Sequence, residues 1–253
     1  MDLFDLSGRV AIITGGSRGI GLAIAEGLAS AGAAVVIANR TADQGERAAE
    51  TLRRKNLKAQ AVPVDVSSRE SVRRMVSTVL QKFEKIDILV NSAALILRKP
   101  TAEVTDEEWD SLFNTNLKGP FICCQEVGRH MVERKQGKII NISSQVIQPL
   151  QPGRGVYAIT KAGLTQLTRV LAFEWAPYNV HVNAIAPGST ITELNRKFFE
   201  EHPEDMKARV QSQPLGRMGQ PRDHVGVALL LASSASDFIT GQTIFVDGGS
   251  NLI

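Results

Sequence analysis

The sequence has little of what several protein classes require. Only two of its 253 residues are cysteines, and because Cys123 and Cys124 are adjacent they make a poor disulfide framework. No apolar run approaches the roughly 18 residues that span a bilayer, and the N-terminal MDLFDLSGR has no apolar signal-peptide core. These absences predict a protein of a reducing compartment, the cytoplasm, with no membrane partner.

Excess charge and metal-binding motifs are also missing. The 29 basic and 26 acidic side chains leave a net charge of only +3 without a sustained basic block, so we predict no nucleic-acid partner. The four histidines are scattered, and the sequence has no H-E-x-x-H and no C-x-x-C motif. We therefore predict no metal site.

What the sequence does contain is a regular alternation of short β-branched runs and stretches of helical spacing, such as Ile20 to Ala31 and Ser68 to Phe83. This alternation predicts an α/β fold, a single-domain Rossmann-like doubly wound parallel sheet with helices on both faces. The length suits one large domain over residues 1–253. We expect strands at 9–14, 33–38, 59–64, 86–91, 137–142, 180–185 and 243–248.

One segment, residues 188–218, interrupts the alternation. It is polar and charged and includes the sequence FFEEHP. A long excursion inside a compact domain is often a binding segment, so we predict a substrate lid around residues 188–218. A surface helical insertion is the alternative, and the two are compatible.

The first predicted strand leads into the glycine-rich stretch TGGSRGIG, residues 14–21. Gly15, Gly19 and Gly21 have the spacing G-x-x-x-G-x-G, which serves the same geometry as G-x-G-x-x-G. Such a turn at the start of a helix brings backbone N–H groups and the positive end of the helix dipole against a phosphate. Glycine turns join many strands to helices, but this position favours a dinucleotide site.

The residues after the second strand bear on which dinucleotide binds. An Asp or Glu usually meets a free ribose 2′-hydroxyl there, but this chain has Asn39 and Arg40. With Arg18 in the glycine turn, two guanidinium groups are available for a 2′-phosphate. We therefore predict NADP(H) rather than NAD(H); the alternative is that both arginines are merely solvated.

Two further stretches follow the third and fourth strands. Asp65 could accept a hydrogen bond from the adenine amino group, or it could cap the helix that begins near SSRE. The small residues of NSAA, 91–94, would let the backbone approach a ribose.

Tyr157 and Lys161 stand four residues apart in GVYAITKAG and would share one face of a helix. A nearby ammonium favours the phenolate by up to about 3 pKa units, which would bring the phenol near physiological pH. Ser144 could hydrogen-bond a substrate oxygen as charge develops there. This set predicts interconversion of a ketone and a secondary alcohol, although the Tyr–Lys spacing alone also occurs by chance.

Together these motifs resemble the short-chain dehydrogenase/reductase family over essentially the whole chain. The resemblance implies an NADP(H)-dependent oxidoreductase acting on CH–OH groups of a small molecule, in a family that usually forms homotetramers. The matching stretches are TGGSRGIG (14–21), Asp65, NSAA (91–94), NTN (114–116), NISS (141–144), YAITK (157–161), APG (186–188) and VDGG (246–249).

The resemblance also implies roles for individual residues. It makes Ser144, rather than Ser143, catalytic beside Tyr157 and Lys161, and it gives Asn116 a water in the proton relay. The family's Asn-Asn-Ala-Gly reads NSAA here, so Ser92 and Ala94 depart from the pattern. The candidate cofactor contacts are Gly15, Ser17, Arg18, Gly19, Ile20, Gly21, Asn39, Arg40, Asp65, Val66, Asn91, Ala93, Tyr157, Lys161, Pro187, Gly188, Thr190 and Thr192.

The sequence leaves three functions open. The start DLFDLSGR and the end ASDFITGQTIFVDGG resemble sugar-acid or polyol dehydrogenases, in which Arg154 and Arg98 could pair with a substrate carboxylate or lie on the surface. The alternative is a 3-oxoacyl-(acyl-carrier-protein) reductase with Arg134 and Lys135 docking the carrier, although Phe173 replaces an arginine common in those enzymes. The distant alternative is a non-catalytic dinucleotide-binding regulator, but such relatives usually lose the tyrosine or the lysine.

Overall fold

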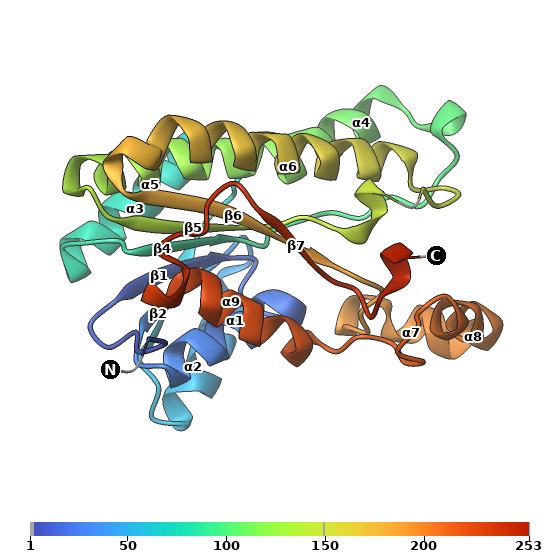
Figure 1. Ribbon diagram of the computed structural model, residues 1–253, viewed down its shortest axis with the longest axis horizontal. Coiled ribbons are helices and arrows are strands. Elements are labelled where there is room, and N and C mark those ends of the chain that lie inside the picture. Colours follow the sequence, from blue (N-terminus) through green and yellow to red (C-terminus); the bar gives the residue numbers. More distant parts are fainter. Residues whose placement is uncertain (1–2, 149, 253) are drawn as a thin grey trace.

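A parallel sheet of seven strands forms the centre of the computed structural model, which describes residues 3–148 and 150–252 of the predicted domain. The strand order is β3-β2-β1-β4-β5-β6-β7, so the connections run in opposite directions from β1 and β4 (Figure 1). The strands are β1 Val10–Thr14, β2 Ala34–Asn39, β3 Ala59–Pro63, β4 Ile88–Asn91, β5 Gly137–Ile142, β6 Val180–Pro187 and β7 Thr243–Val246.

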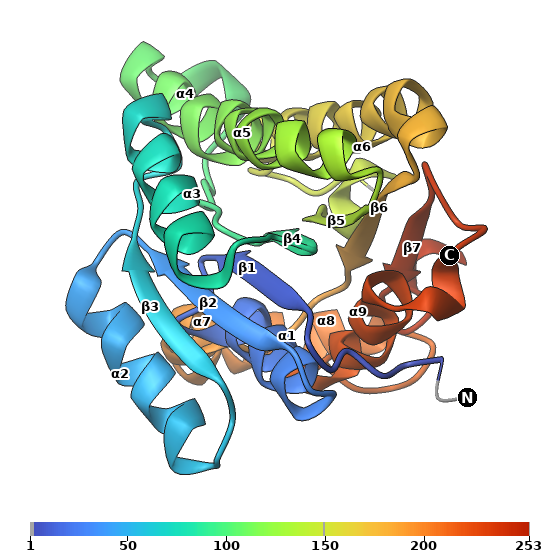
Figure 2. The same cartoon turned by 90° about the vertical axis from the view of Figure 1, so that its left-hand side faces the viewer.

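Helices cover both faces of this sheet, and Figure 2 shows the two helical layers on its opposite sides. Helices α3, α4, α5 and α6 form one layer, and α1, α2 and α9 form the other (Figure 1). The bounds are α1 Gly19–Ser30, α2 Ala42–Arg54, α3 Arg69–Phe83, α4 Asp106–Phe113, α5 Gly119–Arg134, α6 Gly155–Trp175, α7 Glu193–Glu201, α8 Pro203–Gln211 and α9 Val225–Ala232. The predicted doubly wound α/β fold is confirmed.

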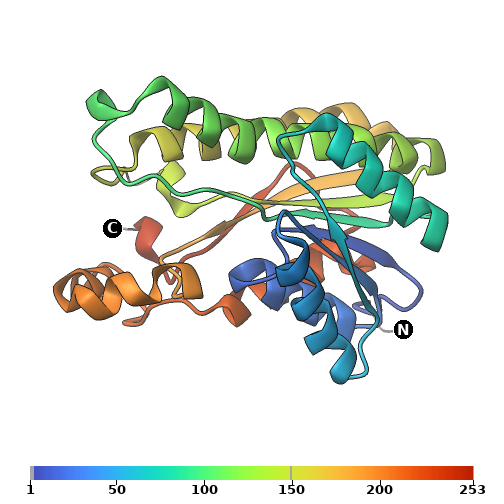
Figure 3. The same cartoon turned by 180° about the vertical axis from the view of Figure 1, so that it is seen from behind.

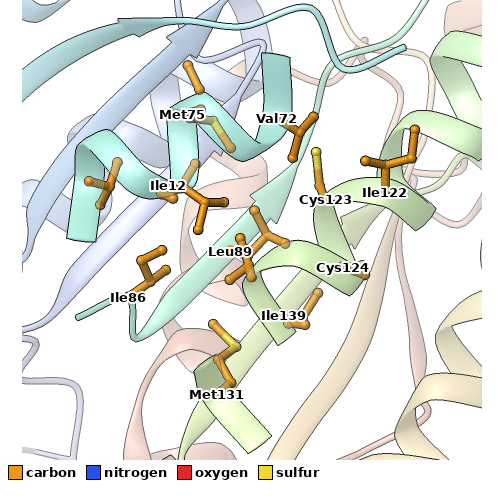
Figure 4. Close-up of a cluster of buried hydrophobic side chains, with 14 of the residues drawn as sticks. Ile12, Val72, Met75, Ile86, Leu89, Ile122, Cys123, Cys124, Met131 and Ile139 are labelled. Atoms are coloured by element: carbon orange, nitrogen blue, oxygen red, sulfur yellow. The ribbon is translucent and has the colours of Figure 1, made fainter. Parts of the chain in front are cut away.

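The strands are apolar on both sides because each side meets a helical layer. Within β1, Ile12 packs into the core beneath α3 and α5, whereas Ala11 and Ile13 pack into the core beneath α1, α2 and α9. Figure 4 shows the first of these cores, including both cysteines on α5. Burial there raises the pKa of the free Cys124 thiol to about 12, so this thiol is a packing group.

The excursion of residues 188–218 folds into α7 and α8 at the carboxyl ends of the strands (Figure 3). An isolated bridge between Thr190 and Gly219, outside the named strands, joins the start of the excursion to the residue after its end. The excursion thus covers the edge of the sheet at which parallel α/β folds bind ligands.

Among the helices of residues 3–148 and 150–252, none is both long and apolar enough to cross a bilayer.

Candidate active site

A cavity of about 320 Å³ lies at the carboxyl ends of the strands, where the strand order reverses between β1 and β4. Its wall includes the glycine loop, the ends of several strands, the start of α6 and parts of the excursion. Of the predicted cofactor contacts, the lining contains Gly15, Ser17, Arg18, Gly19, Ile20, Gly21, Asn39, Arg40, Asp65, Val66, Ala93, Tyr157, Lys161, Pro187, Gly188, Thr190 and Thr192.

The glycine loop leaves room for nothing larger than glycine at several points. Gly15 and Gly19 have φ angles of +65° and +57°, a region that glycine reaches without strain. A Cβ on Gly15 would lie 2.8 Å from Cα of Ala93, and one on Gly21 would lie 2.5 Å from the Gly15 carbonyl oxygen. These close approaches keep the loop flat against the end of β4.

The loop also presents the start of α1 to the cavity. Arg18 is the N-cap residue, and a guanidinium cannot accept a hydrogen bond, so it leaves the first N–H groups of the helix available. Free N–H groups and the helix dipole at this point fit a pyrophosphate. The residues present therefore fit a dinucleotide.

Asn39, Arg18 and Arg40 line the part of the cavity next to the end of β2. The Ser17 hydroxyl donates to Oδ1 of Asn39 at 3.0 Å, and Nδ2 of Asn39 donates to the Thr41 carbonyl at 3.1 Å. This pair of bonds ties the glycine loop to the end of β2. Arg18 and Arg40 are exposed at the cavity rim, where both can reach an anion.

The ends of β3 and β4 complete this half of the site. Ser68 caps α3 by accepting a hydrogen bond from the Ser71 N–H, whereas Asp65 lines the cavity. Oδ1 of Asp65 accepts hydrogen bonds from the N–H and the hydroxyl of Ser67, at 2.9 and 2.6 Å. Ser68, and not Asp65, is therefore the residue that caps α3.

Thr14, which the sequence analysis did not single out, shapes the end of β4. Its Oγ1 accepts hydrogen bonds from the N–H groups of Ser92 and Ala93, at 3.1 and 3.3 Å. Its position directly before the glycines could have indicated this role in the sequence. The two hydrogen bonds fix the backbone that follows the last residue of β4 beside the end of β1.

Asn91, predicted as a cofactor contact, has its side chain in the core. Nδ2 of Asn91 donates to Oδ1 of Asn141 at 2.9 Å and to the sulfur of Cys124 at 3.3 Å. Asn141 in turn donates to the Thr168 hydroxyl of α6 at 2.9 Å. The side chain of Asn91 is only 2% exposed and joins β4, β5 and the helices above them.

The predicted catalytic side chains meet where β5 ends and α6 begins. Tyr157 and Lys161 lie on the buried face of α6, and Nζ of Lys161 donates to the Ile142 carbonyl at 2.7 Å. The Ser144 and Tyr157 hydroxyls are hydrogen-bonded. Ser143 instead packs against α6, with its hydroxyl 2.8 Å from that of Thr165. The geometry thus places Ser144, and not Ser143, beside the phenol.

Burial dominates the electrostatics of this pair. We expected Lys161 to lower the pKa of Tyr157, but burial raises that pKa, opposed by the hydrogen bond to Ser144 and by the charge of Arg154. Burial also lowers the pKa of Lys161 to about 8. Nζ of Lys161 lies 5.8 Å from the centroid of the Tyr157 ring. The phenol is therefore protonated at neutral pH, which suits a proton donor.

Asn116 lies behind α6, in a π-helical turn between α4 and α5 that spans Asn114–Lys118. Its Oδ1 accepts from the Leu95 N–H at 2.8 Å, and its Nδ2 donates to the Leu95 carbonyl at 2.9 Å. Nδ2 also lies 3.3 Å from the Thr160 hydroxyl of α6. Asn116 thus couples the loop after β4 to the catalytic helix, through a π turn of a kind frequent at functional sites.

The loop after β6 runs along the opposite side of the cavity. The Gly188 N–H donates to the Val246 carbonyl at 2.9 Å, and a Cβ on Gly188 would lie 2.5 Å from Cα of Asp247. Thr192 then caps α7 in a capping box with Asn195. Pro187, Gly188 and Thr192 are thereby fixed to the sheet and to the start of the excursion.

His224, which the sequence analysis noted only as one of four scattered histidines, holds Thr190 in this loop. The Thr190 hydroxyl donates to the Gly188 carbonyl at 3.1 Å and lies 3.0 Å from Nε2 of His224. Because that hydroxyl proton is already used, the histidine must donate from Nε2. No sequence signal marked this contact, which joins residues on separate segments.

Three arginines line the cavity together with Tyr157. Arg98 and Arg154 were predicted, but Arg209 of α8 was missed because nothing in its local sequence separates it from a surface residue. Cζ of Arg98 lies 4.4 Å above the centroid of the Phe198 ring of α7. Burial, and then the charges of Arg98 and Arg209, lower the pKa of Arg154 to about 10.

Burial of His224 makes stability depend on pH. Its pKa is lowered to about 4, chiefly by burial and against the attraction of Asp223, which pairs with Arg217. The unfolded chain takes up this proton near pH 6.5, so stability is complete above that pH and falls toward pH 4.

We expect this group to contribute a slope of up to about 1.4 kcal/mol per pH unit in the unfolding free energy. His224→Gln should remove this contribution, the uptake of one proton on unfolding, from the pH dependence of the unfolding free energy between about pH 6.5 and 4. Denaturant unfolding of the parent and the variant across this range measures that pH dependence. Identical slopes would contradict the assignment.

Comparisons with known proteins agree over nearly the whole chain. A family model described as enoyl-(acyl carrier protein) reductase matches residues 15–251. Gluconate 5-dehydrogenase of Gluconobacter oxydans is 39% identical over 248 residues, covering 98% of this chain and 96% of the relative. The 3-oxoacyl-(acyl-carrier-protein) reductase of Aquifex aeolicus is 38% identical over 245 residues, covering 96% and 98%.

A solved structure is equally similar. Gluconate 5-dehydrogenase from Burkholderia cenocepacia, in complex with NADP and tartrate, has a TM-score of 0.95 and 40% identity, covering 100% of this chain and 98% of that one. Sequence, fold and site agree, and the chain therefore belongs to the short-chain dehydrogenase/reductase family, as an oxidoreductase that acts on CH–OH groups.

Proposed function

We propose that the protein uses NADP(H) to interconvert a ketone and a secondary alcohol, on a sugar acid, a polyol or a similar small carbonyl compound. The observation that carries the proposal is the hydrogen-bonded pair of Ser144 and Tyr157 next to the buried Lys161. These three side chains share one cavity with the arginines that could hold a carboxylate. The relatives named for gluconate support the substrate class.

The cofactor-facing residues have distinct parts in this proposal. The backbone of the glycine loop would hold the pyrophosphate, Asp65 and Val66 would hold the adenine, and Ala93 would pack near a ribose. Pro187 and Gly188 would hold the nicotinamide, with the backbone of Thr190 and with Thr192 available to its carboxamide. When bound, the cofactor supplies the hydride in reduction and accepts it in oxidation.

The proposed catalytic residues transfer the proton. In reduction, Tyr157 donates its hydroxyl proton to the substrate oxygen while the carbon gains the hydride, and Ser144 hydrogen-bonds that oxygen. Lys161 uses one of its three N–H donors on the Ile142 carbonyl, and the others are available to the nicotinamide ribose and to the relay that returns the proton. Asn116 holds the water of that relay.

Two exposed arginines support the preference for NADP(H). Asn39 stands where a carboxylate would repel a 2′-phosphate, and Arg18 and Arg40 line the same end of the cavity. NADP is also the cofactor named for the Burkholderia structure. A bidentate guanidinium contact favours a phosphate over a hydroxyl.

Arg40→Asp should shift the ratio of kcat/KM for NADP(H) to that for NAD(H) toward NAD(H), by about 10- to 100-fold. The lost charge-assisted bond and the new repulsion act in the same direction. Arg47→Asp on α2, also exposed but outside the cavity lining, is the matched control. A parent enzyme that prefers NAD(H) would sink the assignment.

The main alternative is a 3-oxoacyl-(acyl-carrier-protein) reductase, supported by the family model and by the Aquifex relative. One contact counts against it: Arg134, a candidate docking residue, donates to the buried Asp87 at 2.9 Å and to the Ile86 carbonyl at 3.0 Å. An arginine already paired with a carboxylate of its own chain is less available to an acidic carrier. Lys135 beside it is exposed.

Parallel assays with 5-ketogluconate and an acetoacetyl thioester separate the two functions. We expect the higher kcat/KM, followed by nicotinamide absorbance, for the sugar acid, because the arginines lie close to Tyr157. Each assay is a reduction and is run with NADPH and with NADH. A higher kcat/KM for the thioester would replace the proposed substrate with the alternative.

We also propose that residues 188–218 act as a lid, since Asn195, Phe199 and Arg209 of α7 and α8 reach the cavity. A homotetramer stays a prediction, supported by the exposed Phe173, with 86% of its surface open on α6. The cytoplasmic location also stays a prediction.

A further inference from the structure

We propose that Arg209 of α8 completes, with Arg98 and Arg154, a subsite for a carboxylate of the substrate, and that Arg209 determines the preference for an acid over a neutral polyol. The inference rests on the proposed function and deepens it. It concerns the one arginine of the three that lies inside the excursion.

The three arginines reach one cavity from three separate parts of the chain. Arg98 lies in the loop after β4, Arg154 is the N-cap residue of α6, and Arg209 lies near the end of α8. All three line the cavity that contains Tyr157. Only the tertiary fold brings these distant segments together at one cavity. Arginines that serve only as solvated surface residues have no need to meet in this way.

Their charges are left unbalanced by the protein. In the part of the chain that the structure describes, none of the three forms an ion pair with a carboxylate. Asp205 attracts Arg98 only from a distance, while Arg98 and Arg209 repel the guanidinium of Arg154. Arg154 and Arg209 are half-buried, whereas Arg98 is exposed. Like charges gathered at one cavity repel one another unless an anion joins them.

The surroundings of the arginines suit a small acid. The ring of Phe198 lies 4.4 Å from Cζ of Arg98, a cation–π contact that orients its guanidinium. The charge of Arg154 reaches the phenol of Tyr157, so the bound carboxylate lies close to the reacting carbon. Phe199 and Met218 add apolar surface to the same wall.

Arg209 also links the anion to the excursion. Helix α8 contributes the guanidinium, and helix α7 contributes the ring beneath Arg98, so a bound carboxylate draws both helices to the start of α6. A neutral polyol of the same length offers the arginines no charge. Arg209 is therefore a specificity-determining residue for the acid.

D-gluconate and D-sorbitol test this inference, because both have six carbons and only the first has a carboxylate. Arg209→Gln should lower kcat/KM for gluconate by about 10- to 100-fold, the effect of losing a charge-assisted hydrogen bond, and change kcat/KM for sorbitol far less. Arg196→Gln, the same substitution at an exposed position on α7, should change neither. Equal losses on both substrates, or no loss on gluconate, would overturn the proposal.

Calorimetric binding of D-gluconate to the cofactor-loaded protein separates this inference from the proposed function. We expect Arg209→Gln to weaken gluconate binding by about 10-fold or more, and Arg196→Gln to leave it unchanged. A parent protein that binds gluconate through Arg209 but oxidises no alcohol supports the subsite and contradicts the proposed function. Gluconate binding that is absent in the parent, or equal in Arg209→Gln, overturns the subsite.

Discussion

The hydrogen bond from Lys161 to the Ile142 carbonyl is the constraint on which the site depends. It anchors α6 to the end of β5 at a distance of 2.7 Å. Tyr157 lies one helical turn before the lysine, and Ser144 follows Ile142 by two residues, so this bond brings all three to one place. Burying the ammonium lowers its pKa to about 8, which eases its exchange of protons.

Two halves of the sheet meet at this place. The half containing β1, β2 and β3 supplies the glycine loop, and the half containing β4 to β7 supplies the catalytic helix and the excursion. The excursion reaches back to the first half, because Cγ2 of Thr192 would lie 3.4 Å from a Cβ on Gly19. The start of the excursion therefore lies close to the glycine loop.

The sequence predicted features that short segments contain. The strands were visible because both faces of the sheet are covered, which makes each strand continuously apolar. The pairing of Tyr157 with Lys161 followed from helical spacing, and the glycine loop from its place between strand and helix. These features need no knowledge of what packs against them.

Features that depend on packing could not be predicted from the sequence. In the sequence Arg209 and His224 look like surface residues, but in the fold Arg209 lines the cavity and His224 contacts Thr190. The direction of the pKa shift of Tyr157 was wrong for the same reason, since burial outweighs the attraction estimated for two isolated side chains. The motif that contains Asn91 also could not reveal that its side chain turns into the core.

The central claim is that the Tyr157 hydroxyl moves the proton, and Tyr157→Phe tests it most directly because only one oxygen is removed. The account predicts that NADP(H) affinity, followed by nicotinamide fluorescence, stays at the parental value while kcat falls by about 100- to 10,000-fold. Turnover by the phenylalanine variant at the parental rate would contradict the account.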